Sequence, residues 1–417
     1  MSCLTYHGNE LFIEEVPLKA VAKAFQTPTY VYSRRAITEQ WHKFDQSFGN
    51  QRHRVCYAVK ANSNLSILHL LAKLGAGFDI VSLGEMERVL TAQGKPEQIV
   101  FSGVGKTTGE IEHALRCGIY CFNVESIPEL ERLQSIAIRL NKTIPIALRI
   151  NPNINAFTHA YISTGMRENK FGIDMESAMA LSERLSSMQG LQLIGLACHI
   201  GSQITDLEPF LSALDHLIDL YHRFTQQGFS IQHLNLGGGL GVTYQQETPP
   251  SIQDYAQAIQ TKVAGLPIEL ILEPGRAMIA HAGVLLTEVH YLKHLTYKNF
   301  AIVDAAMNDL LRPALYGAWQ DILPVELRPG EKKHYDIAGP VCESADFLGK
   351  HRELVLQEKD LLAVDGAGAY GFSMSSNYNS RPRAAEVLID GSEMHLIRRR
   401  ETIKDLFAAE IVISNNK

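Results

Sequence analysis

The sequence predicts an α/β protein with a (β/α)₈ barrel of the TIM type and a second, C-terminal antiparallel β domain. Between about residues 54 and 275, short β-branched runs alternate with amphipathic stretches. After about residue 280, short strand-like runs follow one another with little helical periodicity. Alternating strands and helices imply right-handed βαβ units and a parallel sheet. Eight such units in about 250 residues match the barrel.

Eight apolar runs in the first region have the composition of strands buried on both faces. They are Val55–Val59, Phe78–Val81, Ile99–Ser102, Ile119–Val124, Pro145–Ile150, Leu193–His199, Gln232–Leu236 and Ile268–Glu273. The stretches between them, such as Leu65–Leu74, place apolar residues three and four positions apart, as amphipathic helices do. A doubly wound open sheet would show the same alternation, so the periodicity leaves these two arrangements open.

The second region reads as strands separated by short turns. These runs are Val284–Tyr291, Phe300–Val303, His334–Ala338, Leu354–Gln357, Leu361–Val364, Ala385–Ile389 and Met394–Ile397. The opening segment would add to this domain, since Leu11–Glu14 and Thr29–Val31 are also strand-like. We therefore expect a barrel over residues 30–280 and a β-rich domain made of residues 1–29 and 281–417.

Composition narrows the class of protein. With 46% hydrophobic and 20% charged residues, the chain can build a packed interior. Its 39 basic and 45 acidic residues give a net charge of −6, which disfavours nucleic acid as a partner. The six cysteines include no CxxC pair, so neither a disulfide scaffold nor a structural zinc site is indicated. Without a signal peptide or a membrane-length apolar run, we expect a soluble, cytoplasmic enzyme.

Chemically capable residues gather where the expected strands end, which is where (β/α)₈ barrels place their active sites. Lys60 follows the first strand and His199 ends the sixth. The glycines Gly237–Gly239 follow the seventh strand, and Glu273 ends the eighth, shortly before Arg276. A reactive amine, an imidazole, a glycine-rich loop and an acid–arginine pair would therefore meet at one mouth of the barrel.

Each of these residues has a plain structural explanation when it is taken alone. Lys60 could extend into solvent, and His199 could be an ordinary core histidine. Four coincidences on one face favour a common function instead. Pyridoxal phosphate chemistry needs this set: a lysine for a Schiff base, a carboxylate that keeps the pyridine nitrogen protonated, and donors for the phosphate. Glycines without a Cβ would let backbone N–H groups approach that phosphate.

The chain resembles the fold type III, barrel-type pyridoxal-phosphate decarboxylases. The matching strings are Tyr57–Asn64 (YAVKANSN), Gly77–Glu85 (GFDIVSLGE), Cys198–Gln203 (CHIGSQ), Leu236–Gly241 (LGGGLG), Glu273–Arg276 (EPGR), Arg312–Gly317 (RPALYG), Gly339–Ser344 (GPVCES) and Gly368–Arg383 (GAYGFSMSSNYNSRPR). They follow the order of the family from residue 57 to residue 383. Any one string would be weak, but the ordered set is specific.

The resemblance implies pyridoxal 5'-phosphate as the cofactor and implies no metal. Lys60 would be the covalent anchor, His199 the ring that stacks on the cofactor, and Glu273 the partner of the pyridine nitrogen. The other cofactor-binding residues that it implies are Asp79, Ser202, Gly237, Gly238, Gly239, Gly275, Arg276 and Tyr370. Cys342 would protonate the carbanion, so the implied catalytic residues are Lys60, Cys342, His199 and Glu273.

The implied reaction is decarboxylation of meso-2,6-diaminopimelate to L-lysine and carbon dioxide, the last step of lysine biosynthesis. The implied substrate-binding residues are Arg276, Arg312, Tyr316, Glu343 and Tyr370. An arginine fork suits the distal carboxylate of that substrate and a glutamate suits its ammonium. The resemblance also implies a homodimer with shared active sites, in which Cys342 and Glu343 serve the neighbour's cofactor.

Three alternatives remain from the sequence. A decarboxylase of ornithine, arginine or lysine is the nearest, although such relatives resemble a Cys-Asp pattern where this chain has Cys342-Glu343. An amino-acid racemase would need a second base, commonly a tyrosine, on the opposite face of the cofactor. A non-catalytic binding protein would be expected to lack Lys60, Glu273 or the glycine loop, and all of these are present.

Overall fold

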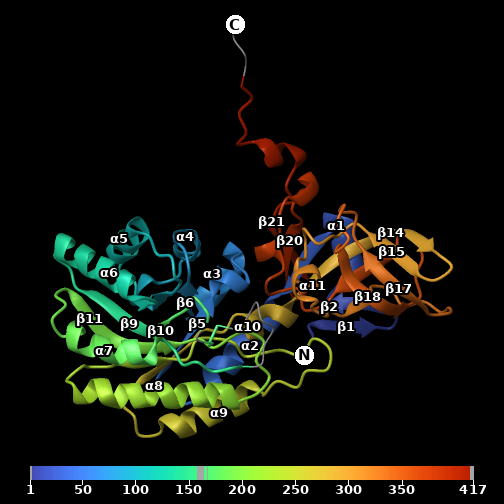
Figure 1. Ribbon diagram of the computed structural model, residues 1–417. Helices are drawn as coiled ribbons and strands as arrows, with labels where there is room; N and C mark the ends of the chain where they lie inside the picture. The colour runs from blue at the N-terminus through green and yellow to red at the C-terminus, as the bar shows by residue number, and fades with distance from the viewer. Residues whose placement is uncertain (1, 157–163, 167, 414–417) are drawn as a thin grey trace. The chain divides into compact units, whose positions relative to one another are not determined.

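The computed structural model describes residues 2–156, 164–166 and 168–413, which form two compact units (Figure 1). The barrel unit comprises residues 38–278, and the β unit comprises residues 1–37 and 279–417. Strand β4 (Thr29–Ser33) falls in the β unit. The sequence alone placed the two limits at 29/30 and 280/281, eight and two residues from these divisions.

The barrel unit is a closed ring of eight parallel strands. In chain order they are β5 (His53–Ala58), β6 (Gly77–Ile80), β7 (Ile99–Phe101), β8 (Cys121–Val124), β9 (Ile144–Asn151), β11 (Leu191–Cys198), β12 (His233–Asn235) and β13 (Glu269–Leu272). Each pairs with the next, and β13 pairs with β5, for example Leu272 with Val55. This last pairing confirms the barrel and excludes the open sheet. The two-residue strand β10 (Ile173–Asp174) pairs with β9 outside the ring.

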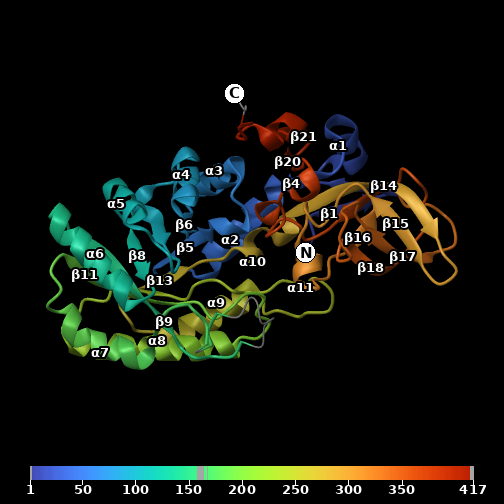
Figure 2. The same cartoon turned by 45° about the horizontal axis from the view of Figure 1, so that its top comes forward.

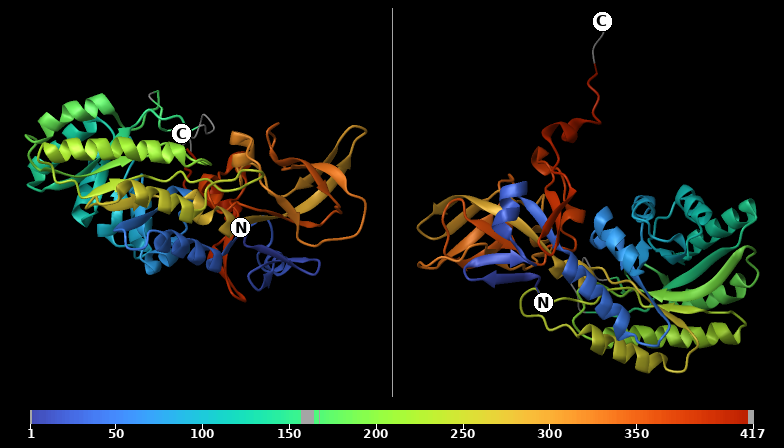
Figure 3. Two further views of the ribbon diagram at one scale, coloured as in Figure 1. Left: turned by 90° about the horizontal axis from the view of Figure 1, so that it is seen from below. Right: turned by 180° about the vertical axis from the view of Figure 1, so that it is seen from behind.

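Helices follow the barrel strands and surround them. They are α3 (Leu65–Leu74), α4 (Leu83–Thr91), α5 (Thr108–Cys117), α6 (Ile127–Leu140), α7 (Met175–Leu185), α8 (Glu208–Gln226), α9 (Ile252–Val263) and the short α10 (Arg276–Ile279), with α2 (Arg34–Ser47) preceding β5. Neighbouring helices from α3 to α6 pack in succession outside β6 and β8 (Figure 2). Helices α8 and α9 run side by side (Figure 3).

Polar caps set where several of these helices begin. The side chains of Ser82, Thr107 and Ser126 accept backbone N–H bonds at the starts of α4, α5 and α6. Such caps satisfy N–H groups that lack a partner within the helix. These three helices therefore begin at defined residues after the carboxyl ends of β6, β7 and β8.

The β unit contains a mostly antiparallel sheet in the order β18-β17-β15-β14-β4-β20-β21, with β19 pairing with β14 and β16 with β19. Its strands are β14 (Gly283–His294), β15 (Asn299–Val303), β16 (Ile322–Pro324), β17 (Lys333–Ala338), β18 (Phe347–Leu354), β19 (Leu361–Val364), β20 (Ala385–Asp390) and β21 (Glu393–Arg398). Only the pairs β15–β17 and β4–β20 are parallel among these described strands. Because β4 lies between β14 and β20, the N-terminal segment does add to this domain.

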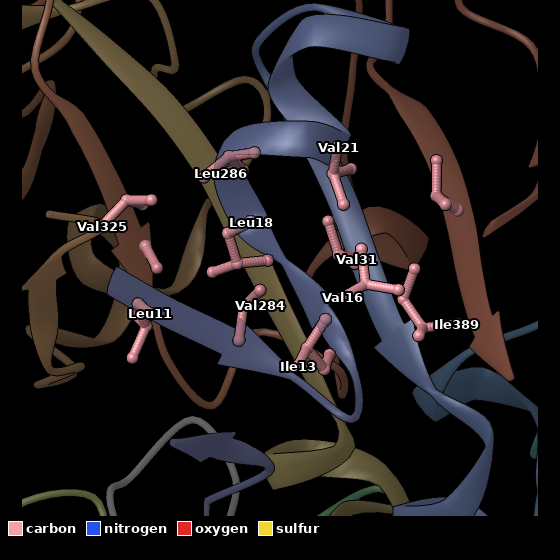
Figure 4. Packing of buried hydrophobic residues seen from close by; sticks show 12 residues of the cluster. Leu11, Ile13, Val16, Leu18, Val21, Val31, Val284, Leu286, Val325 and Ile389 are labelled. Atoms are coloured by element: carbon pink, nitrogen blue, oxygen red, sulfur yellow. The ribbon is translucent and has the colours of Figure 1, made fainter. Parts of the chain in front are cut away.

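A small sheet and one helix complete the core of the β unit. Strands β1 (Leu4–His7), β2 (Glu10–Ile13) and β3 (Val16–Pro17) pair antiparallel, and α1 (Leu18–Phe25) follows them. Their apolar side chains, including Ile13 and Leu18, pack with Val31, Val284 and Ile389 of the large sheet (Figure 4). Segments from both ends of the chain therefore share one hydrophobic core, which stabilises the unit by removing apolar area from water.

One expected strand of this unit is wrong. The sequence suggested a strand at Leu354–Gln357, but β18 runs from Phe347 to Leu354 and ends where that strand was to begin. Strand β18 lies at an end of the sheet order and carries Lys350 and His351 exposed. An edge strand tolerates polar residues, so its pattern lacks the apolar run on which the prediction relied. The buried Leu356 lies in the following loop.

In the part of the chain that the structure describes, none of the helices combines the length and the apolar character that crossing a membrane requires.

Candidate active site

Lys60 lies directly after β5, in the short 3-10 helix η1 (Val59–Ala61). Its Nζ donates a hydrogen bond to Oδ2 of Asp79 at 2.8 Å. Asp79 is fully buried on β6, where it pairs in register with Ala58, so the two strands place the amine and the carboxylate side by side. The other oxygen, Asp79 Oδ1, is buried and makes no hydrogen bond to the described residues. The ammonium is therefore held at the carboxyl end of the barrel by a buried counter-charge.

Glu273 follows β13, and amide side chains hold one of its oxygens. Oε1 accepts hydrogen bonds from Nδ2 of Asn235 at 2.7 Å and from Nδ2 of Asn123 at 3.3 Å. Burial raises the pKa of this carboxyl group from 4.5 to about 8, with a further increase from the charge of Asp79, while Lys60 acts in the opposite direction. Since Oε1 already accepts two bonds, the neutral acid carries its proton on Oε2.

The raised pKa of Glu273 predicts a pH dependence of stability in the cofactor-free protein. A carboxyl whose folded-state pKa lies above its ordinary value of 4.5 contributes stability that is full below pH 4.5 and is lost as the pH rises through about 8. We expect the free energy of unfolding, relative to that of Glu273→Gln, to fall across this window, as measured by urea unfolding at several pH values. The exposed Glu183→Gln is the control and should keep the wild-type slope. The same slope in Glu273→Gln as in the wild type would contradict the assignment.

His199 stands immediately after β11 and is held as a neutral ring. The N–H of Gly238 donates to its Nδ1 at 3.1 Å, so the imidazole carries its proton on Nε2. Burial lowers the pKa of His199 well below the usual value, and the positive charges of Arg149 and Lys60 lower it further. A neutral aromatic ring fixed by the glycine loop is suited to packing against a planar ligand.

The glycine loop after β12 is required for close approach of backbone segments. A Cβ on Gly238 would lie 2.2 Å from the carbonyl oxygen of Glu273, and Gly237 has a left-handed φ of 67°. The N–H of Gly237 donates to Asn235 Oδ1 at 2.8 Å, as that of Gly238 does to His199. Two of the three N–H groups that were expected to bind the phosphate therefore already have partners. That of Gly237 fixes Asn235, which holds Glu273, and that of Gly238 fixes His199. The phosphate-binding role of this loop stays a prediction.

Arg276 begins α10 directly after Gly275 and is buried. Its guanidinium donates to the hydroxyl of Tyr244 and to Oγ of Ser202, each at 3.0 Å. Ser202 was expected from the sequence to belong to the same shell, and the structure does place it against Arg276. A fixed guanidinium beside two hydroxyl groups is a typical environment for a phosphate or a carboxylate.

A cavity of about 420 Å³ lies at the carboxyl ends of the barrel strands. Its lining residues are Lys60, Val81, Ser102, Gly103, Val104, Gly105, Asn123, Arg149, Thr164, Lys170, Phe171, Ala197, Cys198, His199, Asn235 and Glu273. The structure thus brings Lys60, His199 and Glu273 to one cavity, as the sequence predicted. Its volume is within the roughly 300–1,000 Å³ usual for small-molecule sites.

Sequence reasoning missed three residues of this site. Arg149 lines the cavity and is nearly buried, and it pairs with Glu125 at 2.8 Å. Asn123 and Asn235 hold Glu273. All three lie within strands that were expected to be buried on both faces. A polar residue inside such an apolar run was the available signal, because a buried polar group requires partners.

The remaining predicted residues belong to the β unit. Arg312 is buried at the start of α11 (Arg312–Tyr316), and Tyr316 is its last, partly buried residue. Cys342 and Glu343 lie in the loop between β17 and β18. Tyr370 has a left-handed φ of 55° in the loop after β19.

Two hydrogen bonds anchor the loop that carries Cys342 and Glu343. The N–H of Cys342 donates to Asn379 Oδ1 at 2.9 Å, while its thiol-bearing side chain belongs to an exposed residue. The hydroxyl of Tyr378 donates to Oε2 of Glu343 at 3.3 Å. The structure therefore presents a cysteine and a glutamate from one ordered loop.

The barrel cavity fits pyridoxal phosphate. It offers an amine for the aldehyde, a carboxyl group with one oxygen left for a ring nitrogen, and a neutral imidazole for the ring face. The buried Asp79 Oδ1, which has no partner among the described residues, is a further acceptor next to that amine. The fold and this set of donors together define a barrel-type pyridoxal phosphate enzyme.

Comparison with known proteins shows to which family, within the barrel-type pyridoxal phosphate enzymes, the chain is similar. Residues 34–280 match the family model of the pyridoxal-dependent decarboxylases, pyridoxal binding domain. The diaminopimelate decarboxylase of Pseudomonas aeruginosa is 55% identical over 413 residues, which cover 99% of this chain and 100% of the relative. That of Vibrio cholerae is 56% identical over 405 residues, 97% of each chain.

A solved structure agrees with the sequence relatives. The crystal structure of diaminopimelate decarboxylase from Helicobacter pylori complexed with L-lysine is 42% identical, with a TM-score of 0.91. The match covers 94% of this chain and 99% of that chain. The chain therefore belongs to the diaminopimelate decarboxylase family of pyridoxal-dependent decarboxylases.

Proposed function

We propose that this chain decarboxylates meso-2,6-diaminopimelate with pyridoxal 5'-phosphate, forming L-lysine and carbon dioxide in the last step of lysine biosynthesis. The observation that carries the proposal is the meeting of Lys60, His199 and Glu273 at one barrel cavity, in a chain 55% identical to a diaminopimelate decarboxylase over 99% of its length. Its place of action would be the cytoplasm.

The barrel unit would hold the cofactor. Lys60 Nζ would be the anchoring amine, and the acid proton of Glu273 on Oε2 would be offered to the pyridine nitrogen. His199 would pack on the ring. Ser202, Gly237–Gly239, Gly275, Arg276 and Tyr370 would bind the phosphate. When bound, the protonated cofactor supplies an electron sink that stabilises the negative charge left by loss of carbon dioxide.

The protein's own groups would control the protons. Asp79 Oδ2, at 2.8 Å from Lys60 Nζ, accepts a hydrogen bond from the amine and would hold it in place for the aldehyde of the cofactor. His199 keeps its proton on Nε2 because Nδ1 accepts from Gly238, so its ring adds no positive charge beside the cofactor. Burial of Glu273 would keep water away from the acid that is offered to the ring nitrogen.

A second set of residues would recognise the substrate and complete the reaction. Arg276, Arg312, Tyr316, Glu343 and Tyr370 would hold the distal amino-carboxylate end, with the arginines on the carboxylate and Glu343 on the ammonium. The thiol of Cys342 would deliver a proton to Cα. We further propose a homodimer in which Cys342 and Glu343 act at the neighbour's cofactor, so that each complete site would need two chains.

A direct assay tests the proposal. The purified protein is loaded with pyridoxal phosphate and offered meso-diaminopimelate, ornithine and arginine separately, and released carbon dioxide is measured. We expect turnover of meso-diaminopimelate, with kcat/KM at least about 10³-fold above that for the other two, because a site built for a charged group loses several kcal/mol when that group is missing. A preference for ornithine or arginine would replace the proposed substrate, and racemisation without carbon dioxide would replace the proposed reaction.

A further inference from the structure

Asp346 connects two segments of the β unit through its buried carboxylate. The residue is 3% exposed. Its Oδ1 accepts the N–H of Met307 at 2.6 Å, and its Oδ2 accepts the N–H of Val341 at 2.7 Å. Met307 lies in the segment that leads to Arg312, and Val341 directly precedes Cys342. One side chain thus joins the segments that carry the proposed substrate-handling residues.

The backbone of Asp346 closes the same loop. Its carbonyl accepts the N–H of Gly339 at 3.2 Å, and its N–H donates to the carbonyl of Glu343 at 3.0 Å. A Cβ on Gly339 would stand 2.5 Å from Asp346 Oδ2 and 2.7 Å from Cα of Ala306. The segments around Ala306 and Gly339 are therefore in close contact beside this carboxylate. Because the packing leaves no free volume there, a change in the hydrogen bonds of Asp346 should shift the backbone of one or both segments.

Asn379 provides a second support from a third segment. Its Oδ1 accepts the N–H of Cys342 at 2.9 Å, and its φ of 55° is in the left-handed region. Near it, Ser376 N–H donates to the carbonyl of Asn308 at 2.9 Å, and Arg381 Nε donates to Asn308 Oδ1 at 3.0 Å. Residues 304–312, 339–346 and 376–381 are therefore held together by hydrogen bonds, most of which use a side chain.

We propose that Asp346 and Asn379 are positioning residues for this enzyme. Asp346 sets the Cys342–Glu343 loop against the segment that leads to Arg312, and Asn379 fixes the backbone at Cys342. The inference rests on the proposed function, because that function assigns substrate handling to Arg312, Cys342 and Glu343. Misplacement of such groups by about 1 Å can cost about 10²-fold in rate.

The test is Asp346→Asn in the cofactor-loaded enzyme. The amide keeps the shape of the carboxylate but turns an NH₂ donor toward the N–H of Met307 or of Val341, so one hydrogen bond is lost. We expect the KM for meso-diaminopimelate to rise at least about tenfold and kcat to fall, while the visible absorbance of the bound cofactor stays unchanged. Hydrogen–deuterium exchange of the peptide 339–346 should become faster.

Asp360→Asn is the matched control. Asp360 is also a largely buried carboxylate of the β unit, which accepts the N–H of Gln357 at 2.7 Å and pairs with Arg328. It has no described hydrogen bond to the three segments. This variant can lose stability, but KM and the exchange of the peptide 339–346 should equal those of the wild type. A merely structural role of Asp346 would leave the two variants alike.

The outcomes separate this inference from the proposed function. Unchanged KM, kcat and exchange in Asp346→Asn overturn the inference and leave the function intact. Faster exchange with unchanged kinetics overturns the positioning role. A wild-type enzyme that does not act on meso-diaminopimelate overturns the function, and the exchange experiment still decides whether Asp346 orders the loop. If Asp346→Asn fails to fold, Asn379→Ala replaces it, with faster exchange at Cys342 and a lower kcat as the supporting result.

Discussion

Replacing Lys60 by alanine should remove the visible absorbance of covalently bound pyridoxal phosphate and lower decarboxylation by on the order of 10⁴-fold or more. The reason is that Nζ is the proposed covalent anchor, which its hydrogen bond to Asp79 at 2.8 Å holds at the carboxyl end of the barrel. Absorbance spectra after reconstitution, and carbon dioxide release at saturating substrate, measure the two effects separately. Because Lys60→Ala leaves the buried Asp79 without its ion-pair partner, circular dichroism is recorded first to show that the variant is folded.

Three further variants make this experiment specific. Lys60→Arg keeps a positive charge beside Asp79 but cannot form the bond, so it should lack the absorbance as well. The exposed Lys73→Ala on α3 should behave as the wild type. Lys170 also lines the cavity. An absorbance that persists in Lys60→Ala and disappears in Lys170→Ala would move the anchor to Lys170.

The barrel strands could be predicted from the sequence because parallel strands that are buried on both faces are almost wholly apolar. The runs at Val55–Val59 and Leu193–His199, for example, correspond to β5 and β11 within two residues at each end. Closure of the barrel could not be predicted in the same way. It depends on pairing between β13 and β5, which are more than two hundred positions apart, and periodicity is a local property.

The candidate site, too, could be predicted from the sequence only in part. Lys60, His199 and Glu273 could be placed together because each follows a strand, and the carboxyl ends of barrel strands converge. The bonds that tune them depend on register and rotamer. The N–H of Gly238 fixes the tautomer of His199. The hydrogen bond from Asn235 to Oε1 of Glu273 leaves Oε2 to carry the proton. Neither contact can be read from spacing along the chain.

Substitution of Arg312 by methionine should reduce kcat/KM for meso-diaminopimelate through a higher KM and leave the cofactor absorbance unchanged. Arg312 is 5% exposed, and its proposed partner is the distal carboxylate of the substrate. Removing one partner of a buried, hydrogen-bonded charge pair costs about 2–5 kcal/mol, or a loss of roughly 30-fold to several thousand-fold. Steady-state kinetics with the reconstituted enzyme measure this loss. Arg312→Lys should recover only part of it, because an ammonium lacks the planar fork.

A substrate pair tests whether Arg312 acts on that carboxylate. D-Lysine has the reacting D-configured centre of meso-diaminopimelate but lacks the distal carboxylate, so its slow turnover should be nearly the same in the wild type and in Arg312→Met. The loss should therefore be confined to meso-diaminopimelate, as in a double-mutant cycle in which one partner is the substrate. The exposed Arg399→Met, which removes a surface arginine paired with Asp405, should change neither substrate. An equal loss for both substrates would show that Arg312 supports the fold of the site rather than recognition of the distal carboxylate.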